Sequence, residues 1–277
     1  MESPVTTDAP MPILTVVVPT RNEERNIGAC IDALAPARDW LEVLVVDNGS
    51  DDRTAEIAQS RGVRVVVQGP ERSAQRNRGW REARTAYVCF LDADMRMKAE
   101  TLDEIRATIS APDAPDALYI REERVGRGWW IKVRNFERSF YDATCIDALR
   151  VFRRSLLEKT GGYDETITGE EDWDLDRLCL AAGARVALTR GALLHDEGAF
   201  SWRRHLRKKK YYSGTMNRYR EKWHNDAVIR RQLGIGYRFF GVFCENGKWR
   251  RALRHPLMMA SIFLERAIVG VVYLASR

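Results

Sequence analysis

Two aspartates separated by one residue follow an apolar run in the first half of the chain. The run spans residues 86–91, and the acids are Asp92 and Asp94. Such a run is typical of a strand inside a sheet, so the acids are expected where that strand emerges. Carboxylate oxygens at this edge can bind a divalent cation, Mg²⁺ or Mn²⁺, that carries a diphosphate. By itself the Asp-x-Asp pattern is weak, because it occurs by chance in many chains.

Two other apolar runs also end in polar side chains. Residues 13–20 are followed by Asn22 and Glu23, and the run at 41–50 carries Asp47 near its end. Ligands of open parallel sheets bind beyond the carboxyl ends of the strands, where such residues converge. Acids after strands also serve as turn residues and helix caps. Three acidic strand ends at one edge nevertheless favour a binding site.

The elements that must position these residues alternate along the chain. Valine-rich runs, which predict strands, are separated by stretches of helical periodicity. The expected strands cover residues 13–20, 41–50, 63–69 and 86–91. Continuous apolar strands joined by helices indicate a mainly parallel sheet with helices on both faces. The expected fold class is therefore α/β.

The charge of the chain is strongly asymmetric. The 277 residues, 45% of them hydrophobic, can form one large core or one core with an appendage. Residues 200–277 contain 18 Lys and Arg against 4 Asp and Glu, whereas residues 1–199 contain 27 against 35. The net charge of +6 thus divides into +14 for the later part and −8 for the earlier part. A basic segment of this kind suggests a polyanionic partner, either nucleic acid or an anionic membrane surface.

Several common sequence signals are absent. The loops GxGxxG and GxxxxGK[ST] do not occur, so a phosphate would be held through a cation and not by a glycine-rich loop. The five cysteines are scattered without a CxxC pair, which is typical of reduced thiols in a cytosolic protein. Residues 1–12 are polar and interrupted by proline, so they predict a disordered lead-in and not a signal peptide.

Five short stretches occur in the order found in one enzyme family. Between residue 13 and about residue 198 they are TVVVPTRNEERNI, VLVVDNGSDDRT, RNRG, FLDADM and GGYDE…GEEDWDLDRL. Together they resemble the family 2 glycosyltransferases of the GT-A fold. The resemblance implies a Rossmann-like central sheet. It also implies a nucleoside-diphosphate sugar as donor, with uridine or guanosine as the expected nucleoside.

The resemblance also assigns roles to single residues. The nucleotide-sugar would contact Pro19, Thr20, Asn22, Glu23, Asp47, Arg76, Asn77, Asp92 and Ala93. Within this set, Asp47 would accept a hydrogen bond from the base, and Asp92 would face the ribose. Two neighbouring arginines, Arg72 and Arg78, are expected on a solvated helix face.

A metal site is also implied. Asp94 would ligate the Mg²⁺ or Mn²⁺ that bridges the diphosphate. His195 follows an apolar run, and some GT-A enzymes take a further metal ligand from a histidine in this region. A hydrogen-bonded turn residue fits that position equally well.

The stretch TGEEDWDLDRLCLAAG, residues 168–183, matches the Glu-Asp element that precedes a helix in the family. The resemblance makes Asp172 the general base, with Glu171 as its supporting neighbour, in a single displacement that inverts the anomeric centre. Acids in the first turn of a helix also suit the helix dipole, which explains Glu170 and Glu171 without catalysis. Clustered carboxylates raise the pKa of at least one member, which suits a base.

The basic region at 200–277 interleaves cationic and aromatic side chains. Such a segment can bind nucleic acid, lie on an anionic bilayer, or form solvated helices on the catalytic body. Residues 256–275 are as long as a membrane span, but Glu265 and Arg266 would lie at its centre. We therefore expect a helix at the membrane interface or packed on the protein. The expected protein is peripheral at the cytoplasmic face of the membrane, acts on a lipid-linked acceptor and binds no nucleic acid.

The sequence thus divides into a lead-in at 1–12, a GT-A catalytic domain at 13–199 and a helical, membrane-associating region at 200–277. The expected setting is the synthesis of cell-envelope glycans. Two other functions share parts of the pattern. A nucleotidyltransferase that forms sugar nucleotides usually has a glycine-rich loop after its first strand, and PTRNEERN has no glycine. A nucleic-acid-binding protein with an inert body would use the basic region, yet none of the expected acids is missing.

Overall fold

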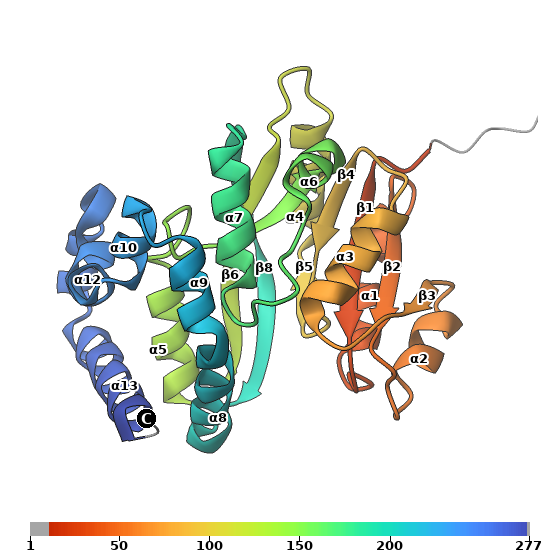
Figure 1. Ribbon diagram of the computed structural model, residues 1–277. Coiled ribbons are helices and arrows are strands. Elements are labelled where there is room, and N and C mark those ends of the chain that lie inside the picture. The colour runs from red at the N-terminus through yellow and green to blue at the C-terminus, as the bar shows by residue number, and fades with distance from the viewer. Residues whose placement is uncertain (1–10, 276–277) are drawn as a thin grey trace, which may run out of the picture.

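A mixed eight-stranded sheet forms the centre of the computed structural model, which describes residues 11–275 (Figure 1). Most of the expected lead-in, residues 1–10, lies outside the described part. The strands are β1 (Leu14–Thr20), β2 (Leu41–Asp47), β3 (Arg64–Val67), β4 (Tyr87–Phe90), β5 (Met95–Met97), β6 (Ala117–Arg127), β7 (Leu149–Arg153) and β8 (Val186–Ala199). Their order in the sheet is β3-β2-β1-β4-β7-β6-β8-β5.

The first four strands are parallel, as the sequence predicts. Beyond them the sheet is mixed, because β7 is antiparallel to both β4 and β6, and β5 is antiparallel to β8. The expected α/β class is confirmed. The four apolar runs of the sequence correspond to the parallel half of the sheet. Within it β1, β2 and β4 are buried on both faces, whereas the edge strand β3 is partly exposed.

Helices cover both faces of this sheet. The helices of the first part are α1 (Ile27–Asp32), α2 (Thr54–Ser60), α3 (Arg72–Glu82), α4 (Ala99–Ile109), α5 (Trp129–Arg138), α6 (Arg154–Thr160) and α7 (Glu171–Ala181). Val16 and Val17 are neighbours in β1 and point to opposite faces. Val16 packs in one cluster with Ile31 of α1 and with residues of α2 and α4. Val17 packs in a second cluster with Leu175 of α7 and with residues of α3 and α6.

The strands β6 and β8 are long enough to form a two-stranded ribbon past the other strands. Their register pairs Arg124 with His195. The short strand β5 lies on the other side of β8 and pairs Met95 with His195. Because Met95 directly follows Asp94, this register places His195 beside the second acid of the Asp-x-Asp pattern.

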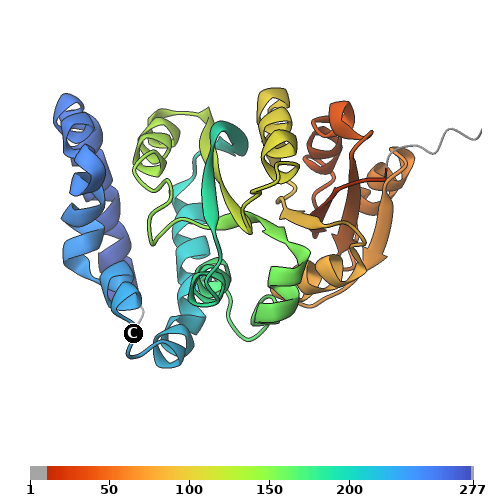
Figure 2. The same ribbon diagram turned by 90° about the horizontal axis from the view of Figure 1, so that it is seen from above.

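The chain after β8 is helical. Its elements are α8 (Trp202–Tyr212), α9 (Met216–Lys222), α10 (Ala227–Leu233), the π-helical turn η3 (Tyr237–Gly241), α11 (Val242–Cys244), α12 (Trp249–Arg254) and α13 (Pro256–Ala275). In Figures 1 and 2 they lie on the side of the molecule away from β3. They share buried clusters with the body, as where Phe140 packs with Ile262 and where Ile167 packs with Tyr219. No helix within residues 11–275 combines the length and apolarity that crossing a membrane requires.

Candidate active site

The carboxyl ends of β1 and β2 are tied together around Asp47, which is buried. Its Oδ1 accepts hydrogen bonds from the hydroxyls of Thr20 at 3.0 Å and Ser50 at 2.5 Å, and its Oδ2 accepts from the backbone N–H of Ser50 at 2.8 Å. Gln75 of α3 donates to carbonyl oxygens of both strands, at 2.9 and 2.6 Å. The predicted residues Pro19, Thr20 and Asp47 therefore share one rigid edge of the sheet.

The loop after β1 brings Asn22 and Glu23 to the same edge. Asn22 has a left-handed backbone with φ of 55°, and its N–H donates to Ser50 Oγ at 2.9 Å. Burial raises the pKa of Glu23, and the charges of Asp94 and Asp92 raise it further. Glu23 is thus within electrostatic reach of the two acids that follow β4.

Arg76 of α3 bridges two of the predicted acids. Its Nη2 donates to Asp92 Oδ1 at 2.9 Å, and its Nη1 donates to Asp172 Oδ1 at 2.8 Å. The Arg76 side chain is 1% exposed, whereas those of Asp92 and Asp172 are 21% and 29% exposed. Burial alone would raise the pKa of Asp92, but Arg76, Arg150 and Arg72 hold it well below its usual range. Asp92 therefore remains a carboxylate at neutral pH.

Glu171 and Asp172 lie in the first turn of α7. Arg72 Nη2 donates to Glu171 Oε1 at 3.2 Å. Burial and the charge of Asp172 raise the pKa of the Glu171 carboxyl. Asp172 Oδ1 also receives the Tyr163 hydroxyl at 3.4 Å. Within the described chain no group donates to Asp172 Oδ2, so this oxygen is available to a ligand.

Asp94 and His195 face each other across β5 and β8. His195 Nε2 lies 3.3 Å from Asp94 Oδ2, and its Nδ1 lies 2.9 Å from Glu122 Oε1. Burial would lower the pKa of His195, but the hydrogen bonds to both carboxylates raise it to about 9. A histidine held by a carboxylate through one nitrogen, with the other facing an acid, is a common arrangement around a bound metal. The pair fits a divalent cation.

The position of Asn77 in the structure differs from the nucleotide contact that the resemblance implies for it. Its side chain is buried, and all its hydrogen bonds stay inside the protein. Its Nδ2 donates to the Tyr163 carbonyl and to Glu165, both at 2.8 Å, and its Oδ1 accepts from the Tyr163 N–H and the Trp80 indole at 2.9 and 3.0 Å. These bonds fasten α3 to the segment before α7. The structure thus gives Asn77 a positioning role and does not place it against a ligand.

The two neighbouring arginines differ from each other. Arg72 is not on a solvated face, because it donates to Glu171 and to the Tyr212 hydroxyl of α8 at 2.9 Å. Arg78 does face solvent, where it pairs with Glu82 at 2.6 Å. The prediction of a solvated side chain is confirmed for Arg78 and wrong for Arg72. The long-range contact with α8 could not be read from the helical spacing of these residues.

Glu122 and Arg150 are site residues that the sequence reasoning missed. Arg150 of β7 lies between Glu122 Oε2 at 3.5 Å and Asp92 Oδ2 at 3.8 Å. Burial would raise the pKa of Glu122, but Arg138, His195 and other cationic neighbours hold it well below its usual range. The available signal was the run REER at 121–124, in which a strand places charged side chains on a face that the sheet buries.

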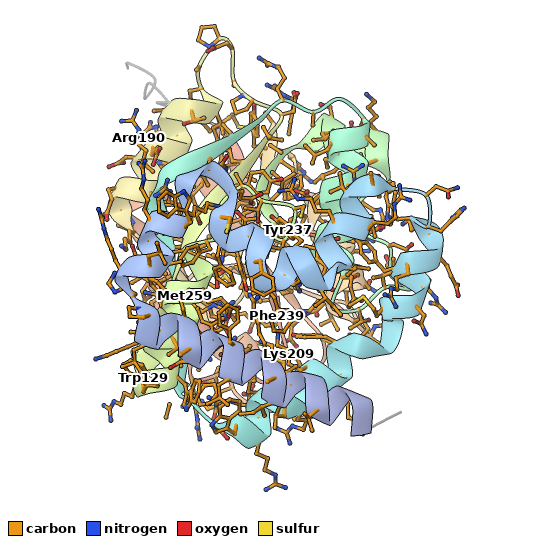
Figure 3. All side chains as sticks on the ribbon, turned by 90° about the vertical axis from the view of Figure 1, so that its left-hand side faces the viewer. Trp129, Arg190, Lys209, Tyr237, Phe239 and Met259 are labelled. Carbon is orange, nitrogen blue, oxygen red and sulfur yellow. The ribbon has the colours of Figure 1, made fainter. Side chains whose placement is uncertain are left out.

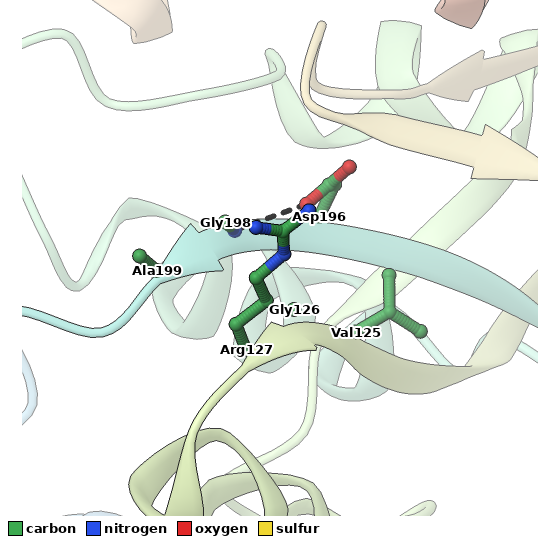
Figure 4. A pocket seen from close by; sticks show the side chains of 6 residues that line it. All are labelled: Val125, Gly126, Arg127, Asp196, Gly198 and Ala199. Atoms are coloured by element: carbon green, nitrogen blue, oxygen red, sulfur yellow. Dashed lines mark hydrogen bonds between the residues drawn. The ribbon is translucent and has the colours of Figure 1, made fainter.

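A pocket opens at the far end of the β6–β8 ribbon (Figure 4). Its volume is about 480 Å³, and it is lined by Val125, Gly126, Arg127, Asp196, Gly198 and Ala199. Arg127 extends from β6 toward Asp196, whose Oδ1 accepts from the Gly198 N–H at 3.0 Å. Side chains alternate along a strand, so Asp196 lies on the opposite face of the ribbon from His195. The pocket is therefore separate from the Asp94–His195 pair.

Comparison with known sequences identifies the family of the chain. The sequence model of Glycosyl transferase family 2 matches residues 15–161. Glycosyltransferase AglE of Haloferax volcanii is 33% identical over 110 residues, which cover 36% of this chain and 36% of AglE. The match thus spans about a third of the length of that relative.

Two solved structures share the fold. Mannosyltransferase PcManGT from Pyrobaculum calidifontis, in complex with GDP-Man and Mn²⁺, superposes with a TM-score of 0.60 at 21% identity, covering 94% of this chain and 75% of that one. Residues 1–349 of S. aureus TarS, in complex with UDP-GlcNAc, give a TM-score of 0.60 at 20% identity, covering 89% and 78%. These likenesses confirm the expected GT-A type of fold. Since the family model matches more than half of the chain, the protein belongs to glycosyl transferase family 2.

Proposed function

We propose that the protein transfers a sugar from a nucleoside-diphosphate sugar to a hydroxyl or phosphate of an acceptor, with inversion of the anomeric centre. One observation carries the proposal. Arg76 joins Asp92, at the predicted nucleotide edge, to Asp172, whose Oδ2 is available to a ligand. The donor side and the candidate base are therefore held in a fixed relation. A displacement reaction gains much of its rate from such fixed geometry.

The nucleotide is proposed to lie along the ends of β1 and β2, against Pro19, Thr20, Asn22 and Glu23. Within the described residues, Asp47 Oδ2 accepts one hydrogen bond, so it retains a lone pair for an N–H of uracil or guanine. The two similar structures contain GDP-Man and UDP-GlcNAc, which supports a guanosine or uridine donor here.

A divalent cation is proposed to bind between Asp94 and His195. Glu122 holds Nδ1 of the histidine, so that Nε2 is the nitrogen left to ligate. The described residues contain no cluster of three or more His, Cys, Asp or Glu side chains suited to a metal. Diphosphate oxygens would complete the coordination, which suits Mg²⁺ or Mn²⁺. When bound, the cation would offset the charge that develops on the leaving diphosphate.

Asp172 is proposed to accept the proton of the attacking acceptor group. Its Oδ1 is anchored by Arg76 and Tyr163, which leaves Oδ2 to receive a hydroxyl proton. Glu171 stabilises the first turn of α7, because its carboxylate accepts hydrogen bonds from Arg72 and from the backbone N–H of Gly169. Since the acceptor attacks the anomeric carbon directly, a single displacement follows, and it inverts that centre.

The acceptor is proposed to be lipid-linked, such as a polyprenyl phosphate or a polyprenyl-diphosphate sugar, and the protein to work peripherally at the cytoplasmic face of a membrane. Helix α8 supports this proposal. It exposes Arg207 and Lys208 and ends at Tyr212, which Arg72 contacts beside Glu171. A basic helix that leads to the candidate site would attract an acceptor that carries phosphate.

Nucleotide binding tests the donor side of this proposal. Thermal unfolding of the wild type is measured with UDP, GDP, CMP or dTDP, each with and without Mn²⁺. We expect UDP or GDP to raise the unfolding temperature only when Mn²⁺ is present, because a ligand of the folded state stabilises it. Asp94→Ala should remove this effect. The control Asp103→Ala, which changes an exposed acid of α4, should retain it. A wild type that no nucleotide stabilises would contradict the proposal, and so would an unchanged response in Asp94→Ala.

A further inference from the structure

Helix α13 exposes a continuous apolar stripe. The stripe consists of Leu257, Ala260, Leu264, Ala267 and Val271, spaced by three and four residues so that they share one helix face. Leu257, Leu264 and Val271 are 66%, 53% and 66% exposed. The stripe extends along the helix for about 20 Å, at 1.5 Å per residue. A surface helix of a protein in water normally shows a polar face to the solvent.

The polar residues of α13 point inward instead. Ser261 and Glu265 are buried, and Glu265 Oε1 lies 3.0 Å from His205 Nε2 of α8. Arg266 donates to Glu137 Oε1 of α5 at 3.0 and 2.5 Å, and to the Tyr141 hydroxyl at 2.9 Å. Glu265 and Arg266, whose charges argue against a membrane span, therefore contact the body of the protein. Among the side chains of α13 that the structure describes, up to Val271, the exposed ones are thus apolar.

The preceding helix adds a basic and aromatic border to the stripe. Trp249 and Leu253 of α12 are 45% and 73% exposed, and the side chains of Arg250 and Arg254 are exposed beside them. Within the described chain, neither arginine pairs with an acid. From residue 246 to the end of the sequence the one acid is Glu265, which is buried. The exposed surface of α12 and α13 is thus apolar and cationic without any exposed acid.

We infer that the outward face of α12 and α13 docks on an anionic lipid bilayer, with α13 lying in the plane of the interface. In Figure 3 α13 crosses the front of the molecule, beside the helical segment that holds Phe239 and Tyr237. Its apolar stripe would enter the headgroup region, and Arg250 and Arg254 would contact lipid phosphates. A second copy of the chain would bring like charges together at this face, whereas anionic lipid neutralises them. The inference deepens the proposed function, because it names the surface by which the enzyme reaches a lipid-linked acceptor.

Vesicle flotation tests the surface directly, without donor or acceptor. The full chain is mixed with vesicles of phosphatidylcholine alone, or with about 30% phosphatidylglycerol added, at roughly physiological ionic strength. We expect flotation with the anionic vesicles and much less with the neutral ones. Leu264→Glu and Val271→Glu each place a charge on the stripe and should reduce binding roughly tenfold or more. The matched control Met11→Glu changes an exposed apolar residue before β1 and should bind as the wild type does.

Further measurements distinguish a loss of membrane docking from misfolding, from a loss of nucleotide binding and from dimer formation. The unfolding temperature and the response to nucleotide with Mn²⁺ should be unchanged in Leu264→Glu, because the residue is exposed on α13, a helix that supplies none of the candidate site residues. A wild type that floats with no vesicle overturns the inference, and so does a Leu264→Glu variant that floats normally. A wild-type dimer in light scattering that Leu264→Glu converts to a monomer also overturns it, since a second copy would then cover the stripe. Flotation by a protein that binds no nucleotide would support the docking surface and contradict only the proposed reaction.

Discussion

The carboxylates of the candidate site are held by other side chains before any ligand binds. Arg76 donates to Asp92 and Asp172, and Glu122 orients His195. Groups that are already oriented need not move when charge develops in a displacement, which is a main source of catalytic rate. A change to one of these residues therefore affects chemistry, stability or both, according to which of its contacts it loses.

Asp172→Asn should remove the base and keep the fold. The amide oxygen can still accept from Arg76, but the side chain can no longer take a proton. We expect turnover with a competent acceptor to fall roughly 10²- to 10⁴-fold, with nucleotide affinity unchanged. Steady-state kinetics and nucleotide calorimetry measure the two effects. The control Asp103→Asn should match the wild type in both, and wild-type turnover in Asp172→Asn would rule out its role as base.

Asn77→Ala should cost stability and leave nucleotide binding intact. The substitution removes hydrogen bonds to Tyr163, Glu165 and Trp80, and it leaves the buried backbone groups of Tyr163 and the buried Trp80 indole unpaired. We expect the free energy of unfolding in urea to fall by about 3 kcal/mol. Arg78→Ala, on the exposed side of the same helix, should change it by less than about 0.5 kcal/mol. A loss of nucleotide affinity without a loss of stability would restore the role that the resemblance assigned to Asn77.

Among the elements, the first turn of α7 carries an energetic cost at neutral pH. Glu170 is buried before this turn, and burial together with the charge of Glu171 raises its pKa to about 7, although Thr215 donates to it at 3.1 Å. The ordinary value is 4.5. The folded state thus binds the proton of the Glu170 carboxyl more tightly than the unfolded state does. Protonated Glu170 therefore stabilises the folded state. This contribution to the free energy of unfolding is complete below about pH 4.5 and is lost as the pH rises through about 7.

Glu170→Gln should therefore stabilise the protein only at higher pH. The glutamine resembles the protonated carboxyl, so the variant and the wild type should have similar free energies of unfolding at pH 5. At pH 8.5 the variant should be more stable by about 2 kcal/mol. Urea unfolding at the two pH values measures the difference. Glu100→Gln, which alters an exposed acid in the first turn of α4, should show no such dependence. An advantage that is equal at both pH values would contradict the assigned pKa.

The elements that could be predicted from the sequence are those whose pattern is local. The strands β1, β2 and β4 are buried on both faces, and a continuous apolar run records that burial. The ribbon of β6 and β8 was not predicted, because its outer half is half-buried and carries charges that find partners on distant elements. Glu122 is an example, since Arg138 and Arg150 make its burial possible. The spacing of residues along the chain does not record such partners.

At the scale of the whole molecule, ion pairs connect the acidic part of the chain, residues 1–199, with the basic region at 200–277. Lys222 of α9 contacts Asp164 at 2.9 Å and the buried Asp174 at 2.8 Å, and Trp223 also donates to Asp174 at 2.8 Å. Acids of the body thus hold cations of the region at 200–277. Exposed cations remain on α8 and α12, where phosphate-bearing partners are proposed, and also on α9 and α10, as at Arg220 and Arg230.

Tyr219→Ala tests whether this region folds together with the body. Tyr219 is fully buried, packs with Ile167 and donates to Gln232 at 2.7 Å. Its removal should lower the free energy of unfolding by roughly 3–5 kcal/mol. If the chain is one cooperative unit, hydrogen exchange of the slowest amides in β1 and β2 should accelerate by the same free energy as that in α9 and α10. The control Tyr211→Ala, at an exposed position, should accelerate neither. Acceleration confined to residues after 200 would instead show that the catalytic domain predicted at 13–199 folds independently.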